Sequence, residues 1–72
     1  MGFEEKYINQ NIERLDIPVS EINILKDNNI KTLGNLCKYS KTDLKEFNIL
    51  PNNINKIQIE LQLLGLNLKG GL

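Results

Sequence analysis

The chain of 72 residues has no histidine, no tryptophan and a single cysteine, Cys37. One thiol cannot form an internal disulfide, and without histidine a structural zinc site lacks most of its usual ligands. The sequence also has no glycine-rich phosphate loop and no nucleophile–base pair, so we predict no catalytic residue, no cofactor and no metal. A lone thiol is typical of a reducing compartment, and we expect a cytoplasmic location.

An excess of charge of either sign is also missing. Lys and Arg number 9 and Asp and Glu number 9, so the net charge is zero. Because non-specific nucleic-acid binders gain most of their affinity by neutralising phosphates, we do not expect a strong one. No apolar run is long enough to span a membrane and no signal-peptide pattern occurs, so no membrane partner is expected. A sequence of this length forms at most one small domain.

The sequence does contain repeated apolar residues at helical spacing, with no strand-like alternation. We predict helices near residues 19–27, 32–38, 41–46 and 52–64. Helix-start signals support them: prolines at two starts, a threonine at the second and a capping box in “SKTD”. The predicted core residues are Val19, Ile22, Leu25, Leu33, Leu36, Leu44, Ile54, Ile57 and Leu61.

Two of the turns between these helices share a pattern. “DNNIK” and “NILP” each place a buried isoleucine in a polar or small turn, which predicts two helix-hairpin-helix-like units. We therefore predict an all-α fold, a compact four- to five-helix domain over residues 12–72. Residues 1–11 are either a short N-terminal helix, over 3–11, or the end of a linker. Cys37 is expected to be a small core residue, and residues 66–72 to trail away as an apolar tail.

Three stretches carry a resemblance to a known family. “LDIPVSEINILKDNNIKTLGNL”, “SKTDLKEFNILPNNINKIQIEL” and “LGLNLKGG” resemble the C-terminal domain of the bacterial RNA polymerase alpha subunit, over roughly residues 12–70. The resemblance implies a domain that binds A/T-rich promoter DNA in the minor groove and contacts the sigma factor and transcription regulators. It also implies a flexible connection to the other polymerase subunits through the parent chain. It implies no catalytic group in the domain, although the parent complex would be a nucleotidyltransferase.

The residues that would face DNA depart from the family pattern. Ser20 stands where the family has its main DNA-contacting arginine, three residues before Asn23. The second hairpin, roughly Leu-Gly-Lys-Lys-Ser in the family, is here “ILPNN” at residues 49–53, with one residue deleted before it. Proline removes an amide donor, and the lost lysines remove charge. We expect neighbouring apolar residues to pin this turn, so that it keeps its geometry and a weak hold on phosphate. They are Phe47, Ile49, Leu50 and Ile54.

The resemblance gives two sets of candidate contact residues. Those for DNA are Ser20, Asn23, Lys26, Asn52, Asn53 and Lys56, together with the helix N-terminal amides at residues 52–54. Asp16 matches an acidic position that faces sigma in the family, although Arg14 reverses a neighbouring one. Four further lysines are either a solvated surface or a partner-binding patch: Lys31, Lys38, Lys41 and Lys45. The alternative function is a module that only binds proteins, on the same fold, with its DNA face lost.

Overall fold

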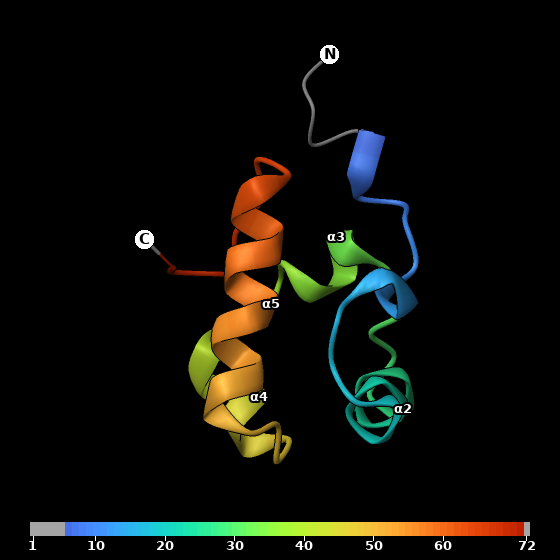
Figure 1. Cartoon of the computed structure of the whole chain (residues 1–72), viewed down its shortest axis with the longest axis vertical. Helices are drawn as coiled ribbons and strands as arrows, with labels where there is room; N and C mark the ends of the chain where they lie inside the picture. Colours follow the sequence, from blue (N-terminus) through green and yellow to red (C-terminus); the bar gives the residue numbers. More distant parts are fainter. Residues whose placement is uncertain (1–5, 72) are drawn as a thin grey trace.

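The computed structural model describes residues 6–71, which form an all-α domain (Figure 1). Its elements are the 3-10 helix η1 (Ile12–Arg14) and the α-helices α2 (Val19–Asp27), α3 (Leu33–Leu36), α4 (Lys41–Glu46) and α5 (Pro51–Leu63). Extended pairing among the described residues is limited to one isolated bridge, between Asn11 and Thr32. The predicted fold class is confirmed, and the predicted bounds of α2 and α4 are those observed.

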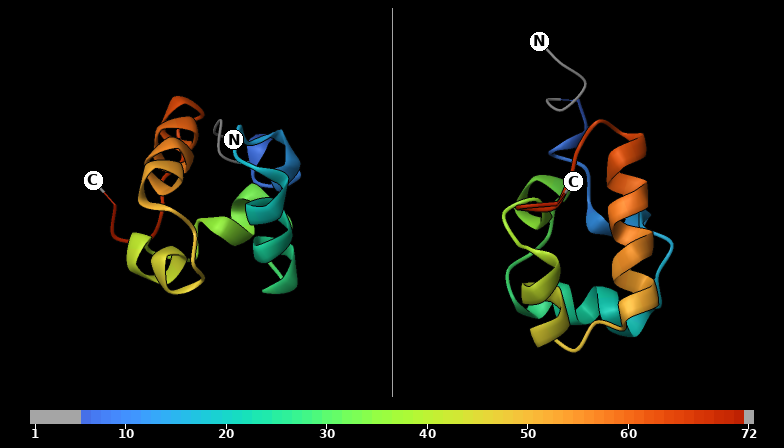
Figure 2. Two further views of the ribbon diagram at one scale, coloured as in Figure 1. Left: turned by 60° about the horizontal axis from the view of Figure 1, so that its bottom comes forward. Right: turned by 90° about the vertical axis from the view of Figure 1, so that its left-hand side faces the viewer.

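The helices pack around one core at steep angles. Figure 1 shows α5 along the long axis of the molecule and α2 nearly end-on, so these two helices cross. Helix α4 lies against the first half of α5, while η1 and α3 lie on the α2 side, as the two views in Figure 2 confirm. The first turn of α2 meets the start of α5 at one end of the molecule, where the two are joined by hydrogen bonds.

Three helices end in the same way. After α2, α4 and α5 the backbone turns through a left-handed residue: Asn29 (φ 62°), Asn48 (φ 70°) and Gly65 (φ 80°). In each case the residue after it donates its amide to a carbonyl five residues earlier, at 2.8 to 3.1 Å. This is the Schellman arrangement, in which an apolar residue after the turn packs back on the helix. The buried residues are Ile30, Ile49 and Leu66. The isoleucine predicted to be buried in each hairpin is therefore confirmed.

Eight of the nine predicted core residues are buried, and Val19 is not. Its side chain is 73% exposed, because it is the first residue of α2 and projects beyond the packed part of the helix. The expectation of a trailing tail is also wrong for residues 66–71. Leu68 lies in the core at 2% exposure, and the Lys69 amide donates to the Tyr39 carbonyl at 2.9 Å.

The segment before η1 is tied to the start of α3. The first amides of a helix have no partner within the helix. Here the Leu33 amide donates to the Gln10 carbonyl at 2.9 Å, and the Gly34 amide to the Ile8 carbonyl at 2.8 Å. A Cβ at position 34 would lie 2.9 Å from that Ile8 oxygen, so glycine permits the approach. Lys6 and Tyr7 are helical but residues 8–11 are not, and the start of the predicted helix lies outside the described residues.

The predicted start signals of α3 and α4 form complete capping boxes. At α4, the Asp43 amide donates to the Ser40 hydroxyl oxygen at 3.1 Å, and the Ser40 amide donates to the Asp43 carboxylate at 2.9 Å. At α3, Thr32 and Asn35 make the same exchange. The hydrogen bonds from Ser40, backbone first, lower the pKa of the Asp43 carboxyl.

The capping box at α4 predicts a specific acid dependence of stability. Because the pKa of Asp43 is lower in the folded state, its stabilising contribution is complete above the unfolded pKa and is lost as the pH falls through the folded pKa. We expect Asp43→Asn to lower the urea midpoint at pH 7, with the difference from wild type vanishing near about pH 2. Glu46→Gln, at the exposed end of the same helix, controls for the loss of one carboxylate. A difference that persists unchanged at low pH would contradict this account.

Cys37 is half-buried at the end of α3 and packs against the core, as expected for a small core residue. Burial raises the pKa of its thiol, and a backbone hydrogen bond with Asn67 opposes this shift. This environment is that of a packed small side chain and not of an activated thiol.

Candidate nucleic-acid interface

Ser20 and Asn23 lie on one exposed stripe of α2. They are three residues apart, a spacing that places two side chains on the same helix face, and both are exposed. Asp27, four residues further on, continues the stripe and is also exposed. The stripe thus offers two uncharged donors and one carboxylate to a partner.

The two lysines among the DNA candidates each lie near an acidic side chain. Lys26, half-buried on α2, forms an ion pair with Glu13. The Lys56 ammonium lies 3.7 Å from the Asp16 carboxylate, with the two side chains 54% and 91% exposed. Exposed pairs of this kind contribute little stability and open easily, so both lysines remain within reach of a partner. Their positive charge is nevertheless largely balanced locally.

Of the two asparagines at the start of α5, Asn52 is exposed whereas Asn53 is buried, at 5% exposure. The Asn53 side-chain amide donates to the Glu21 carboxylate at 2.6 Å, so this side chain faces inward and is not available to DNA.

The prediction that neighbouring apolar residues pin this turn also needs correction. Ile49 and Ile54 are buried, but Leu50 is 57% exposed because it is the residue just before α5 and points to solvent.

The backbone amides at the start of α5 are mostly used within the domain. The Asn53 and Ile54 amides both donate to the Leu50 carbonyl at 2.9 Å, and Pro51 has no amide hydrogen. Among the described residues, the Asn52 amide alone in this turn has no hydrogen-bond partner within the domain. The expected row of three outward amides at residues 52–54 is therefore reduced to one.

Glu21 is the residue that the sequence analysis missed. It is 5% exposed in the first turn of α2, and its carboxylate accepts the Leu50 amide at 2.9 Å as well as the Asn53 side chain. It thereby joins the first turn of α2 to the start of α5. The available signal was its spacing, because Glu21 lies four residues before the core residue Leu25 and therefore on the buried face of α2.

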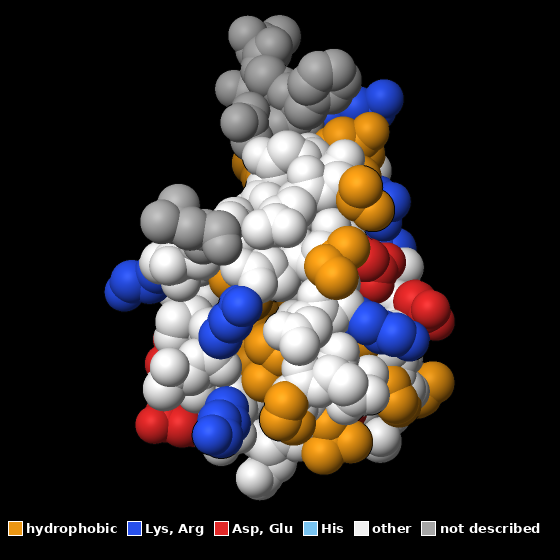
Figure 3. All heavy atoms as spheres, turned by 60° about the vertical axis from the view of Figure 1, so that its left-hand side comes forward, with side chains coloured by type: hydrophobic (Ala, Val, Ile, Leu, Met, Phe, Trp, Pro, Cys, Tyr) orange, Lys and Arg blue, Asp and Glu red, His pale blue; other side chains and the backbone are white. Residues whose placement is uncertain are grey.

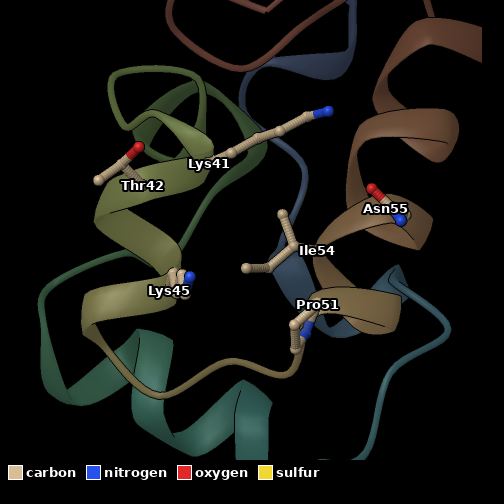
Figure 4. Close-up of a pocket in the computed structure, with 6 residues that line it drawn as sticks. All are labelled: Lys41, Thr42, Lys45, Pro51, Ile54 and Asn55. Atoms are coloured by element: carbon tan, nitrogen blue, oxygen red, sulfur yellow. The ribbon is translucent and has the colours of Figure 1, made fainter.

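A second surface lies between α4 and α5, and we call it the α4–α5 groove. It is a hollow of about 230 Å³ lined by Lys41, Thr42, Lys45, Pro51, Ile54 and Asn55. In Figure 4, Ile54 points from α5 toward α4, and Lys41 extends across the upper part of the groove. A second hollow of about 290 Å³ shares Lys41 and includes Lys69. Figure 3, which views this side, shows basic side chains beside an apolar strip.

The lysines of the α4–α5 groove differ from those near α2. Within residues 6–71, the ion pairs are those of Lys26 and Lys56, so Lys41 and Lys45 of the groove have no carboxylate within 4.0 Å, and neither has Lys69 of the second hollow. The same residues contain no cluster of His, Cys, Asp and Glu that could hold a metal ion, and no helix long and apolar enough to cross a membrane. The geometry thus consists of exposed donors and charged side chains on a small helical scaffold.

Comparison with known proteins identifies this scaffold. A family model for the C-terminal domain of the bacterial RNA polymerase alpha subunit matches residues 3–63. The protein belongs to this family. Its relatives include the DNA-directed RNA polymerase subunit alpha of Clostridium botulinum strains Hall, Langeland and Okra, each 34% identical over 67 residues. The match covers 92% of this sequence and 21% of each relative, so the chain spans about a fifth of their length.

Membership of the alpha C-terminal domain family explains why the sequence resemblance extended beyond the apolar framework. The match includes α2, the hairpins and the whole of α5, which are the elements that carry the candidate contacts. Ser20 and Asn52 are exposed, and each is the neighbour in sequence of a residue in the contact between Glu21 and Asn53. Asp16 lies beside another DNA candidate, Lys56, with which it forms an ion pair. Asn53 alone among the seven candidates has its side chain directed into the domain.

Proposed function

We propose that this protein contacts upstream promoter DNA, as the C-terminal domain of an RNA polymerase alpha subunit, during transcription initiation. The observation that supports this most is the placement of exposed donors around the junction of the two helix-hairpin-helix units. Ser20 and Asn23 on α2 and Asn52 on α5 are exposed and flank that junction. Other polymerase subunits would be reached through the parent chain, and the domain itself would carry no catalytic group.

The chemistry of these donors sets the expected mode of binding. Serine and asparagine side chains donate to phosphate oxygens and to the acceptors in the minor groove, which reads A·T against G·C base pairs. They bring no charge, and the lysines nearby are balanced by Glu13 and Asp16. Binding is therefore weak, depends little on salt, and relies on the local concentration that the parent complex provides.

Protein partners would use two other surfaces. Asp16, 91% exposed at its side chain, offers a carboxylate to a basic segment of the sigma factor once Lys56 releases it. A transcription regulator with acidic side chains around an apolar one would fit the α4–α5 groove. Its lysines have no carboxylate partner in the described part of the protein, and Ile54 lies between them.

The α4–α5 groove also favours the second candidate function, a module that only binds proteins. Near α2, Lys26 and Lys56 are each paired with a carboxylate, of Glu13 and Asp16, which leaves little net charge to attract phosphates. Lys41 and Lys45 in the groove have no carboxylate within 4.0 Å among the described residues, so an acidic protein partner is the better fit there.

The test is a titration of the ¹⁵N-labelled protein with an A/T-rich duplex at low salt, with amide shifts followed residue by residue. The DNA-binding proposal predicts that amides 20–26 and Asn52 shift together, and less with a G/C-rich duplex of equal length. The second candidate predicts that they stay still while an acidic peptide with one leucine shifts amides 41–45 and 54–58. Shifts in neither experiment would contradict both functions.

A further inference from the structure

The buried carboxylate of Glu21 has an unusual environment. Its partners are the Leu50 amide at 2.9 Å and the Asn53 side-chain amide at 2.6 Å, both neutral donors from the start of α5. No basic side chain lies within 4.0 Å of it among the described residues. A charge taken out of water normally requires a counter-charge or several strong hydrogen bonds. Here hydrogen bonds and helix dipoles provide the compensation.

Two helix N-termini converge on this carboxylate. Glu21 lies in the first turn of α2, and its oxygens accept hydrogen bonds from residues that begin α5. Each N-terminus carries a partial positive charge that stabilises an anion. Helix α5 has no side-chain cap from its own preceding residue, Leu50. Glu21 therefore takes the place of an anion at the start of α5, where it accepts the amide of Leu50, the residue just before the helix, and the side-chain amide of Asn53.

An external phosphate at this turn would find the donors already taken. Leu50 and Asn53 are occupied by Glu21, Pro51 has no amide hydrogen, and one outward amide remains, at Asn52. It would also meet the negative charge of Glu21, which is held in place and little screened because it is buried. Both effects act against anion binding at this turn.

We propose that Glu21 is a specificity-determining residue that fills the anion position at the start of α5 and excludes phosphate from it. This inference rests on the proposed DNA contact and refines it. The hairpin “ILPNN” is occupied by the protein's own carboxylate, and DNA is approached through the flanking Ser20, Asn23 and Asn52. The result is a contact that favours uncharged minor-groove acceptors over backbone phosphates.

The direct test uses inorganic phosphate as the probe, at constant ionic strength kept with chloride. In the wild-type protein, the amides of Leu50, Asn52 and Asn53 are expected not to shift with phosphate. In Glu21→Gln, which removes the charge and keeps the size, they are expected to shift saturably. The same variant is expected to bind an A/T-rich duplex about fivefold more tightly at low salt, since one repulsive charge near a phosphate is gone. Glu46→Gln, an equal charge change at an exposed position of α4 outside the candidate contacts, is the matched control.

A double variant separates charge from shape. Glu21→Gln combined with Asn53→Asp exchanges the donor and the acceptor of this hydrogen bond, so that the carboxylate is at position 53 and the amide at position 21. The net charge is that of the wild type. The double variant is expected to exclude phosphate as the wild type does. If Glu21→Gln unfolds, Glu21→Ala is the second variant that removes the charge, and the amides of Leu50, Asn52 and Asn53 are again expected to shift saturably with phosphate.

The outcomes distinguish this inference from the function on which it rests. DNA binding by the wild type, with no phosphate shift and no gain of affinity in folded Glu21→Gln, would overturn the role of Glu21 alone. Phosphate shifts in Glu21→Gln, with no DNA binding by any form of the protein, would support the role of Glu21 and reject the DNA function. Equal gains in Glu21→Gln and Glu46→Gln would reduce the effect to net charge and overturn the inference.

Discussion

Leu61→Ala is expected to destabilise the domain by about 2–5 kcal/mol, the usual cost of removing a fully buried leucine. Leu61 has no exposed surface, and its carbonyl accepts the Leu66 amide at 2.8 Å, so it supports both the core and the end of α5. For a domain of this size the whole free energy of unfolding is roughly 4–11 kcal/mol. The loss would leave a large unfolded fraction at physiological temperature, measurable by urea denaturation followed by circular dichroism.

Leu63→Ala is the matched control for this prediction. It makes the same chemical change on the same helix, two residues away, where the side chain is 81% exposed. We expect its free energy of unfolding to lie within about 0.5 kcal/mol of the wild type, as for most surface substitutions. Equal losses in the two variants would mean that α5 does not present the Leu61 face to the core.

Asn52→Lys is expected to raise the affinity for an A/T-rich duplex roughly tenfold near 50 mM salt and to steepen the salt dependence by about one unit of slope. Asn52 is exposed, immediately precedes Asn53, and has the free amide of this turn. A lysine there adds one phosphate contact beside the position that Glu21 occupies. Fluorescence anisotropy across a series of salt concentrations measures both quantities.

Asn9→Lys controls for the gain of one positive charge. Asn9 is exposed in the segment before η1, which lies at the opposite end of the molecule from the start of α5 (Figure 1). It should change the salt slope much less. If Asn52→Lys leaves the affinity at low salt unchanged, the start of α5 does not face the DNA backbone, and the family contact does not carry over to this position.

Much of the fold was predictable because its signals are local. The capping boxes, the prolines at helix starts and the left-handed turns after α2, α4 and α5 depend on residues within one or two turns of each other. Val19 failed as a core prediction because helical spacing identifies a stripe but not where the packing of that stripe stops. The tail failed because its contacts are made with residues distant in the sequence: Leu68 packs in the core, and the Lys69 amide donates to the Tyr39 carbonyl.

The sequence was sufficient to predict which positions belong to the candidate site. It was not sufficient to predict which of their side chains are exposed or which partners they bind. The resemblance located Ser20, Asn23, Asn52 and Asn53, and the first three are exposed. Asn53 could not be assigned correctly, since its burial depends on Glu21, 32 residues earlier in the sequence. The ion pairs of the lysines likewise join residues from different elements, so the balance of charge on this face was not visible in the sequence.

The sequence by itself determined the four α-helices, the bounds of α2 and α4, the buried isoleucine in each hairpin and the family, because those follow from periodicity, backbone preferences and residue order. Only the tertiary structure decided which polar groups are free. It set the first turn of α2 against the start of α5, which placed the Glu21 carboxylate on the donors of the second hairpin. The physical reason is that hydrogen bonds and charges act through space, and the crossing of α2 and α5 determines which of them meet.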